Sequence, residues 1–264
     1  MENLGKVFFV GAGPGDPKLI TVKGLEVLKE AEVVVYDRLL SPQLLDYAPE
    51  GAELINCGKQ KDHHPIPQEE INQILVHFAM QGKLIVRLKG GDPSIFGRVG
   101  EEAEAIAEQQ IPFEIVPGVT SGIAASLYAG IPLTHRDYSS SVTFVTGHRR
   151  SDRSMEDLDW AYLAQGVDTV VFYMGMSNLP LIQEQLIRQG RNALTPVALI
   201  RWGTLEKQEV LIGELWNIVQ EAKRKSFQSP VIIVIGEVVK LREKLEWFGK
   251  RDLNVIEPLQ LQFK

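Results

Sequence analysis

The stretch KLIVRLKGGDPSIFGR, Lys83–Arg98, is the most informative part of the sequence, because a buried-strand pattern runs directly into a glycine pair followed by Asp92 and Pro93. Its first half is an apolar, β-branched run that is typical of a strand inside a sheet. Gly90 and Gly91 allow a sharp turn and let a ligand approach the backbone closely. Asp92, fixed by the following Pro93, suits a cationic or hydroxyl-bearing ligand better than a phosphate. The pattern predicts a small-molecule site at the carboxyl end of a strand, where open α/β sheets bind their ligands.

Length and composition limit the class of protein. The 264 residues suffice for one large domain or two modest ones, and 44% hydrophobic against 23% charged residues is an ordinary globular balance. A net charge of −6 disfavours nucleic acid as a partner. No apolar run approaches the roughly 20 residues that span a bilayer, and the single Cys57 cannot form an intrachain disulfide. We predict a cytoplasmic protein that binds neither membrane nor nucleic acid.

The first half of the chain alternates strand-like and helix-like segments. Strands are predicted at Lys6–Val10, Glu32–Tyr36, Lys83–Leu88 and Phe113–Val116. Helices are predicted at Thr21–Ala31, Gln68–Gln81, Val99–Gln110 and Val119–Ala129. This alternation is typical of βαβ units, in which helices cover a parallel sheet.

A second block begins near Ser139, after the polar, turn-rich stretch THRDYSSS, Thr134–Ser141. Its predicted strands are Val142–Val145, Thr169–Tyr173, Pro196–Ile200 and Pro230–Ile235. Its predicted helices are Met155–Ala164, Leu179–Arg188, Leu215–Arg224 and Val238–Phe248. The predicted fold class is α/β, with an N-terminal α/β lobe (residues 1–136), a C-terminal α/β lobe (137–248) and a tail (249–264). A ligand cleft is expected between the lobes.

The loop GAGPGDP, Gly11–Pro17, follows the first predicted strand as a dinucleotide-binding loop would. The fingerprint G-x-G-x-x-G, however, requires glycine where this chain has Asp16. Pro14 and Pro17 remove backbone donors, and the Asp16 carboxylate would repel a pyrophosphate. The sequence disfavours dinucleotide binding and leaves open a tight turn without a ligand.

Asp37 and Arg38 end the second predicted strand, again at the carboxyl end of the sheet. They form either an exposed ion pair of little energetic weight or a functional carboxylate beside the cleft. The polar loop Gly58–His64 is either a solvated loop or a basic rim for an anionic ligand. Its adjacent histidines are weak evidence for a metal, and we predict no metal site.

Two further segments have two interpretations each. Thr120 or Ser121 either caps a helix or donates to a ligand at the helix start. The segment Thr134–Asp137 offers an acid, a base and a guanidinium, and it is either a salt-bridged hinge or part of a site. The common hydrolase, nucleotide-loop and zincin motifs are missing from the sequence.

Segments in order from Val10 to Val239 resemble the tetrapyrrole (corrin/porphyrin) methyltransferase family. They are VGAGPGDPKLITVKGL, VVYDRLLS, CGK followed by His64, PQEEIN, VRLKGGDPSIFGR, EEAEAI, IPFEIVPGVTSG, YAGIPLTHRDY, SVTFVTGH, FYMGM, PVALIRWGT and SPVIIVIGEVV. Ordered agreement over nearly the whole chain is more specific than any single loop. The YDR and THRDY segments favour members that act on uroporphyrinogen III over relatives that modify precorrins, form diphthine or modify ribosomal RNA.

The resemblance implies two α/β lobes that hold S-adenosyl-L-methionine (SAM) in the cleft between them. Gly90, Gly91 and Asp92 would contact the methionine end of SAM. The other implied cofactor-binding residues are Pro14, Ile95, Thr120, Ser121, Met174 and Gly203. Asp37 and Lys59 match positions proposed in the family as proton acceptor and proton donor.

The implied reaction methylates uroporphyrinogen III at C2 and C7, giving precorrin-2 by way of precorrin-1 and leaving S-adenosyl-L-homocysteine, for sirohaem or cobalamin synthesis. The eight carboxylates of this substrate require local cations in an acidic protein. The candidates are Arg38, Lys59, His64, Arg98, His135 and Arg136. The loop Lys59–His64 reads KQKDHH and departs from the family pattern, which often has arginine after the lysine and glycine shortly before the histidine. The resemblance also implies a homodimer and a stand-alone methyltransferase without a fused dehydrogenase–ferrochelatase module.

Two other function classes remain open at this point. One is a protein that binds SAM or a tetrapyrrole without catalysis. The other is a nicotinamide-dependent enzyme that uses the Gly11–Pro17 loop. Cofactor titration and the mass of the product distinguish both from a methyltransferase.

Overall fold

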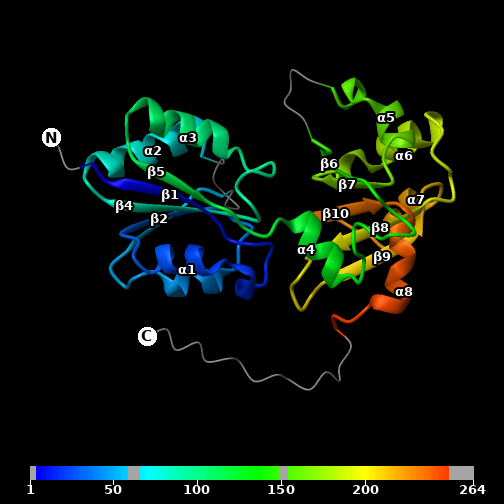
Figure 1. Cartoon of the computed structure of the whole chain (residues 1–264), viewed down its shortest axis with the longest axis horizontal. Helices are drawn as coiled ribbons and strands as arrows, with labels where there is room; N and C mark the ends of the chain where they lie inside the picture. Colours follow the sequence, from blue (N-terminus) through cyan, green and yellow to red (C-terminus); the bar gives the residue numbers. More distant parts are fainter. Residues whose placement is uncertain (1–3, 59–65, 149–153, 250–264) are drawn as a thin grey trace.

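A computed structural model describes residues 4–58, 66–148 and 154–249 of the chain. Two five-stranded sheets lie side by side, each with helices packed on it (Figure 1). The short helix α4 (Ser121–Tyr128) follows the last strand of the first sheet and lies between the two layered bodies in this view. In the described residues no helix is both long enough and apolar enough to cross a membrane.

The first sheet is entirely parallel and has the order β3-β2-β4-β1-β5. Its strands are β1 (Lys6–Gly11), β2 (Val33–Tyr36), β3 (Glu53–Asn56), β4 (Leu84–Lys89) and β5 (Phe113–Val116). Its helices are α1 (Val22–Leu28), α2 (Gln68–Met80) and α3 (Val99–Glu108), with 3₁₀ turns η1 (Pro17–Leu19) and η2 (Pro42–Tyr47). Figure 1 shows α2 and α3 on one face of the sheet and α1 on the other.

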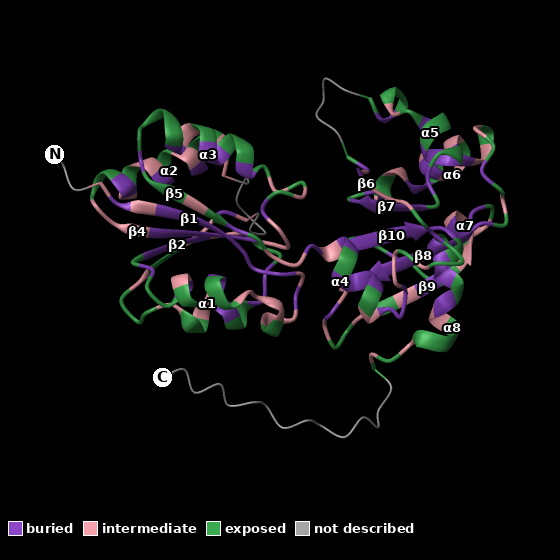
Figure 2. Cartoon of the chain, in the orientation of Figure 1, coloured by how far each residue is buried: buried purple, intermediate pink, exposed green. Residues whose placement is uncertain are grey.

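Alternation along β1 explains why both faces of the first sheet are covered. Val7 and Phe9 belong to the apolar cluster that includes residues of α2 and α3, whereas Phe8 and Val10 belong to the cluster on the α1 side. Successive side chains of a strand point to opposite faces, so a parallel sheet buried on both sides reads as a continuous apolar run. Figure 2 shows β1, β2 and β4 as mostly buried and the outer helix faces as exposed.

The second sheet has the order β6-β7-β10-β8-β9, and only β6 and β7 pair in parallel. Its strands are β6 (Val142–Thr146), β7 (Thr169–Tyr173), β8 (Pro196–Arg201), β9 (Glu209–Glu214) and β10 (Val231–Ile235). Its helices are α5 (Trp160–Gln165), α6 (Leu179–Arg188), α7 (Ile218–Arg224) and α8 (Arg242–Leu245). The 3₁₀ turns are η3 (Met155–Asp157), η4 (Met176–Asn178) and η5 (Glu237–Leu241).

The α/β fold class is confirmed, and the eight predicted strands are present with ends shifted by at most a residue or so. Two strands were missed. Both β3 and β9 are edge strands with half-exposed side chains, so neither carries a buried-strand pattern. The predicted helix Met155–Ala164 is wrong in part, because Ser154 and Asp159 cap two separate short helices, η3 and α5. The predicted helix Val238–Phe248 is likewise divided into η5 and α8.

Helix α4 precedes the predicted lobe boundary at residue 136 but packs with the second sheet. Ala125, Ala129 and Ile131 share an apolar cluster with Val171 of β7 and Val234 of β10. The chain therefore passes to the second layered body immediately after β5. The boundary between residues 136 and 137 stays a prediction.

Candidate functional site

The carboxyl ends of β1, β2, β4 and β5 meet at one edge of the first sheet because all four strands are parallel. The register places Gly11 beside Lys89 and Tyr36 beside Leu88. The loops that follow these strands are Gly11–Pro17, Asp37–Leu40, Gly90–Arg98 and Pro117–Thr120. The edge therefore gathers the glycine turns predicted from sequence, at the position where open α/β sheets bind ligands.

Three glycines from three of these loops meet at this edge, and at Gly11 and Gly118 the packing leaves no room for a side chain. A Cβ on Gly118 would lie 2.4 Å from the carbonyl oxygen of Gly91 and 2.7 Å from the Cα of Gly11. Gly91 also has a φ of 70°, which favours glycine. A short backbone bridge joins Gly13 to Gly91, with N–H···O distances of 3.2 and 2.8 Å. These glycines are required by the fold itself.

Gly90 differs from these three glycines. A Cβ there would make only ordinary contact, 3.5 Å from the nearest atom, the carbonyl oxygen of Leu39, and the residue is half-buried. Neither packing nor a positive φ requires glycine at this position. The missing side chain therefore leaves room next to the backbone, which is what a ligand that contacts the turn would need.

Asp92 joins the Gly90 turn to the loop after β5. Its Oδ2 accepts the N–H of Gly118 at 2.9 Å, and its Oδ1 accepts the N–H and hydroxyl of Ser94 at 2.8 and 2.5 Å. Partial burial acts to raise the pKa of Asp92, but the hydrogen bonds from Ser94 and Gly118 outweigh it and hold the pKa below its usual value. The carboxylate stays ionised, and Oδ2 keeps a lone pair for a further donor.

The second sheet contributes Tyr173, at the end of β7, to the same region. Its hydroxyl accepts the N–H of Gly122 at 2.9 Å and lies 2.8 Å from the hydroxyl of Thr120, so Thr120 binds this tyrosine and makes no cap on α4. The Tyr173 ring lies edge-on to Phe96 with centroids 5.0 Å apart. Ile95 packs against the same apolar cluster. The start of α4 and the Gly90 loop are thereby joined to the second sheet.

Met174 and Gly203 follow the ends of β7 and β8. Met174 has a φ of 53° and is 51% exposed. Gly203 touches α4, because a Cβ there would lie 2.3 Å from the Cβ of Ala125. The structure thus brings both close to Tyr173 or to α4, next to Thr120 and Ser121.

The Gly11–Pro17 loop connects the two bodies. The N–H of Asp16 donates to the hydroxyl of Thr204 at 2.9 Å, and the hydroxyl of Tyr128 donates to Asp16 Oδ2 at 2.9 Å. Asp16 Oδ1 also accepts the N–H of Lys18, which caps η1. Pro14 is half-buried in this loop. The side chain that breaks the dinucleotide fingerprint therefore has a structural partner in the other body.

Asp37 lies at the same edge and contacts a group of buried charged side chains. The sequence analysis did not predict this group. Its Oδ1 accepts Arg87 Nη2 at 2.6 Å, and its Oδ2 lies 3.4 Å from the N–H of Gly90. Arg87 also contacts Glu102 of α3, as does Lys89. The sequence signal was available, because Arg87 and Lys89 interrupt the otherwise apolar run of β4.

The predicted substrate-binding cations do not all lie at this edge of the first sheet. Arg38 is exposed beside Asp37, while Arg98 starts α3 and pairs with Glu101 at 2.6 Å. His135 and Arg136 lie in a turn whose Ser139 hydroxyl bonds Thr169, at the start of β7. Tyr173 lies at the other end of that strand. The predicted Lys59 and His64 lie outside the described residues.

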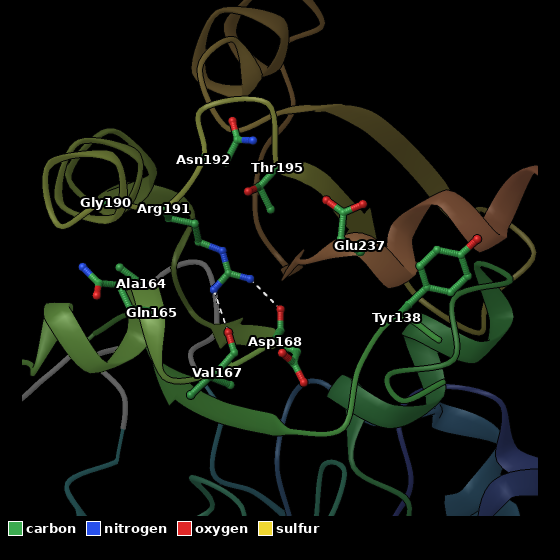
Figure 3. A pocket seen from close by; sticks show the side chains of 10 residues that line it. All are labelled: Tyr138, Ala164, Gln165, Val167, Asp168, Gly190, Arg191, Asn192, Thr195 and Glu237. Atoms are coloured by element: carbon green, nitrogen blue, oxygen red, sulfur yellow. Dashed lines mark hydrogen bonds between the residues drawn. The ribbon is translucent and has the colours of Figure 1, made fainter. Parts of the chain in front are cut away.

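A polar cavity of about 280 Å³ lies at the start of β7 in the second body (Figure 3). Arg191 points across it and donates to the carbonyl oxygens of Val167 and Asp168 at 3.0 and 2.5 Å. The Asp168 carboxylate accepts from Ser140 and Ser141, and Glu237 pairs with Lys240. These charged groups are satisfied by the protein, so the cavity offers no group that calls for a ligand.

Three comparisons place these features among known proteins. The model of the family described as Tetrapyrrole (Corrin/Porphyrin) Methylases matches residues 6–218. The chain is 54% identical over 236 residues to Uroporphyrinogen-III C-methyltransferase of Priestia megaterium, covering 89% of this chain and 99% of the relative. It is 50% identical over 247 residues to Siroheme synthase of Hahella chejuensis, covering 94% of this chain and 52% of that longer relative.

A solved structure resembles the fold as a whole. It is the uroporphyrin-III C-methyl transferase of Thermus thermophilus complexed with S-adenyl homocysteine, with a TM-score of 0.77 and 36% identity, covering 90% of this chain and 100% of that one.

Proposed function

Because the chain belongs to the tetrapyrrole (corrin/porphyrin) methylase family, we propose that it is a SAM-dependent C-methyltransferase that converts uroporphyrinogen III to precorrin-2. The relatives named uroporphyrinogen-III C-methyltransferase and siroheme synthase support this substrate. The single observation that carries the proposal in this structure is the Gly90 turn, which is open to a ligand at the carboxyl edge of the first sheet although the fold does not require glycine there.

SAM would be held where the two bodies meet. The solved relative with bound S-adenyl homocysteine supports a cofactor of this class. The Gly90 and Gly91 backbone and the free lone pair of Asp92 suit the amino group and sulfonium at the methionine end. Thr120, Ser121 and Ile95 border this turn, with Met174 and Gly203 on the side of the second sheet and Pro14 in the adjoining loop. SAM supplies the electrophilic methyl group when bound.

The protein's main task in this reaction is alignment. A reduced porphyrinogen is already an enamine-like carbon nucleophile, so the chain must hold that carbon about 3–3.5 Å from the methyl group and in line with sulfur. Positive charge moves onto the tetrapyrrole as the bond forms. Asp37, held by its contact with Arg87, is proposed to stabilise that charge and then to accept a proton. Lys59 is proposed as the proton donor.

The carboxylates of the substrate would meet cations at the rim of the site. Arg38 is exposed beside Asp37 and Arg98 is exposed at the start of α3. His64, His135 and Arg136 complete the proposed set, and the last two lie in the turn whose Ser139 contacts the start of β7. Because exposed charges are screened by salt, the Michaelis constant for the substrate is expected to rise with ionic strength.

We extend the proposal to the cellular form of the protein. A homodimer is expected from the family resemblance, and a cytoplasmic location is expected from the composition. The lobes are proposed as residues 1–136 and 137–248 with a tail at 249–264. Light scattering after size exclusion gives the oligomeric state. A monomer at micromolar concentration would remove the dimer from the proposal without affecting the reaction.

The test of the reaction combines a titration with a product mass. Calorimetry with SAM should show saturable binding, and incubation with SAM and uroporphyrinogen III should add two methyl groups. Gly90→Ala should fold and lose SAM affinity, while Asp37→Asn should bind SAM and turn over slowly. Binding of NAD in place of SAM would favour the nicotinamide alternative. Saturable SAM binding with no gain in mass would leave a binding protein.

A further inference from the structure

A chain of four charged side chains runs from the interior of the first sheet to its carboxyl edge. Glu102, Lys89 and Arg87 have 0%, 2% and 3% of their side chains exposed, whereas Asp37 has 35%. Glu102 Oε1 accepts Lys89 Nζ at 2.7 Å and Arg87 Nη2 at 3.2 Å, and Arg87 Nη2 also reaches Asp37 Oδ1 at 2.6 Å. Two cations and two carboxylates thus balance, and Asp37 is the one member with access to solvent.

Burying these charged side chains is energetically unfavourable compared with an apolar interior of the same shape. Removing an ion from water costs several kcal/mol, and replacing a buried ionic group by apolar residues of similar volume is often neutral or stabilising. The structure bears an additional cost, because Glu102 Oε2 is buried without a hydrogen-bond partner. Stability alone therefore gives no reason for two charged residues in β4 and a third, Glu102, on α3, which points to a role at the exposed end of the chain of charges.

The geometry of Arg87 shows what that role can be. Its guanidinium is fixed by Glu102 and by the carbonyl oxygen of Val35 at 3.4 Å, so the fork cannot rotate freely. Only arginine offers several donors in a rigid plane that can bridge two carboxylates. The second oxygen of Asp37 faces the N–H of Gly90. One oxygen of the carboxylate therefore binds a buried cation, and the other oxygen faces the turn that is open to a ligand.

We propose that Arg87, with Glu102 and Lys89 beneath it, is a positioning residue that holds the Asp37 carboxylate oriented toward the Gly90 turn. This rests on the proposed function for its effect on turnover but not for its effect on Asp37. Glu102 fixes Arg87, and Lys89 balances the second negative charge. The interior of the sheet thereby sets the position of the one acid that we place beside the reacting carbon.

The charged and titratable groups facing this unit are consistent with the assignment. Burial acts to lower the pKa of Arg87, but Asp37 and Glu102 outweigh it and raise the pKa above its ordinary value. Burial and the neighbouring Arg87 lower the pKa of Lys89, and burial raises the pKa of the Cys57 thiol close by. Arg87 is thus the permanent cation of the group, and the thiol is neutral.

The test is a double-mutant cycle between Arg87→Met and Asp37→Asn. Arg87→Met leaves Lys89 and Glu102 as a balanced pair and removes the grip on Asp37. With Asp37 present, it should lower kcat about 10- to 100-fold, the scale of a misplaced catalytic group, with little change in KM for SAM. In the Asp37→Asn background, the same substitution should change kcat less than about twofold. An equal loss of kcat in both backgrounds would overturn the proposal.

A second readout needs no turnover, so it separates this proposal from the proposed function. The ¹³C carboxyl resonance of Asp37, assigned by its disappearance in Asp37→Asn, should move in Arg87→Met and stay in place in Lys89→Met. Arg87→Lys keeps the charge but cannot bridge both carboxylates, and it serves if the methionine variant does not fold. A resonance that is unmoved in the folded Arg87 variant contradicts the positioning role even if the wild-type chain transfers methyl groups.

Discussion

The two sheets bury charge in opposite ways. In the first, Arg87, Lys89 and Glu102 neutralise one another and lead to Asp37 at the site edge. In the second, β7 and β10 are buried along their whole length and carry no charged side chain. The buried charge there, Arg191, donates to four backbone carbonyls instead of to a carboxylate.

This difference between the two sheets indicates which body holds the proposed reacting groups. A charge satisfied by backbone carbonyls binds loops together and can serve stability alone. A buried set of ions that ends at one exposed carboxylate can instead fix the position of that carboxylate. We therefore place the proposed reacting groups on the first sheet, whereas the second sheet supplies an apolar platform whose Tyr173 binds the start of α4.

The largest expected effect on stability, and the strongest test of the difference between the two sheets, is that of Glu102→Ala. This substitution leaves Arg87 and Lys89 as two buried cations with only the half-buried Asp37 to compensate them, and breaking a buried ion pair costs about 3–5 kcal/mol. Urea unfolding followed by circular dichroism measures the loss. Glu104→Ala, on the exposed face of the same helix, is the matched control and should stay within about 0.5 kcal/mol of wild type. Similar losses in the two variants would mean that the buried charges are not coupled.

A smaller effect on stability should distinguish a glycine that the fold requires, Gly118, from Gly90 in the candidate site. Gly118→Ala places a Cβ against the backbone of Gly91 and Gly11 and should destabilise the chain by about 2–3 kcal/mol. Gly90→Ala has room for its Cβ and should change stability by less than about 0.5 kcal/mol. We expect SAM affinity to fall at least about tenfold in Gly90→Ala, a loss of about 1.4 kcal/mol. Unchanged affinity in that variant would show that the turn does not contact the cofactor.

Much of the fold could be predicted from sequence because apolar periodicity marks buried elements. The strand that begins at Phe113 and the helix Leu179–Arg188 were predicted with their observed ends. The antiparallel pairing of β8, β9 and β10 was not, because strand direction depends on how the chain returns and not on local composition. Edge strands such as β3 escape the same reasoning because half of their residues face water.

The site divides in the same manner. The Gly90–Asp92 turn could be found because glycine pairs after a strand carry a local meaning. The charges of Arg87 and Lys89 in an apolar strand are visible in the sequence, but their partners are not, because Arg87 meets Asp37 only once β2 pairs with β4 and meets Glu102 only once α3 packs on the sheet. The same holds for Tyr173, whose hydroxyl accepts the N–H of Gly122 on α4, 51 residues earlier in the chain. Long-range polar contacts leave no periodic signal.

A third prediction tests the platform role of the second sheet. Tyr173→Phe removes the hydroxyl that accepts the N–H of Gly122 and leaves this buried donor unsatisfied, at a cost of about 1–2 kcal/mol. The ring contact with Phe96 is retained. The melting temperature should fall by several degrees, and hydrogen exchange at the start of α4 should accelerate. The control Tyr162→Phe alters a tyrosine that is 53% exposed and should leave both measurements unchanged.

The smallest effect concerns the link between the bodies and depends on pH. Partial burial, followed by the hydrogen bond to Asp16 and its negative charge, raises the pKa of Tyr128 to about 12. The folded chain therefore favours the neutral phenol, whereas in the unfolded chain the group titrates near pH 10. The contribution to stability is fully present below about pH 10 and is lost as pH rises toward about 12.

Tyr128→Phe removes this contribution at every pH. The difference in unfolding free energy between wild type and Tyr128→Phe should be about 1 kcal/mol and constant from pH 7 to 9, and it should shrink between pH 10 and 12. Urea midpoints at each pH measure it, with Tyr162→Phe again as the control. If the difference persisted undiminished at pH 12, the bond to Asp16 would not depend on the neutral phenol.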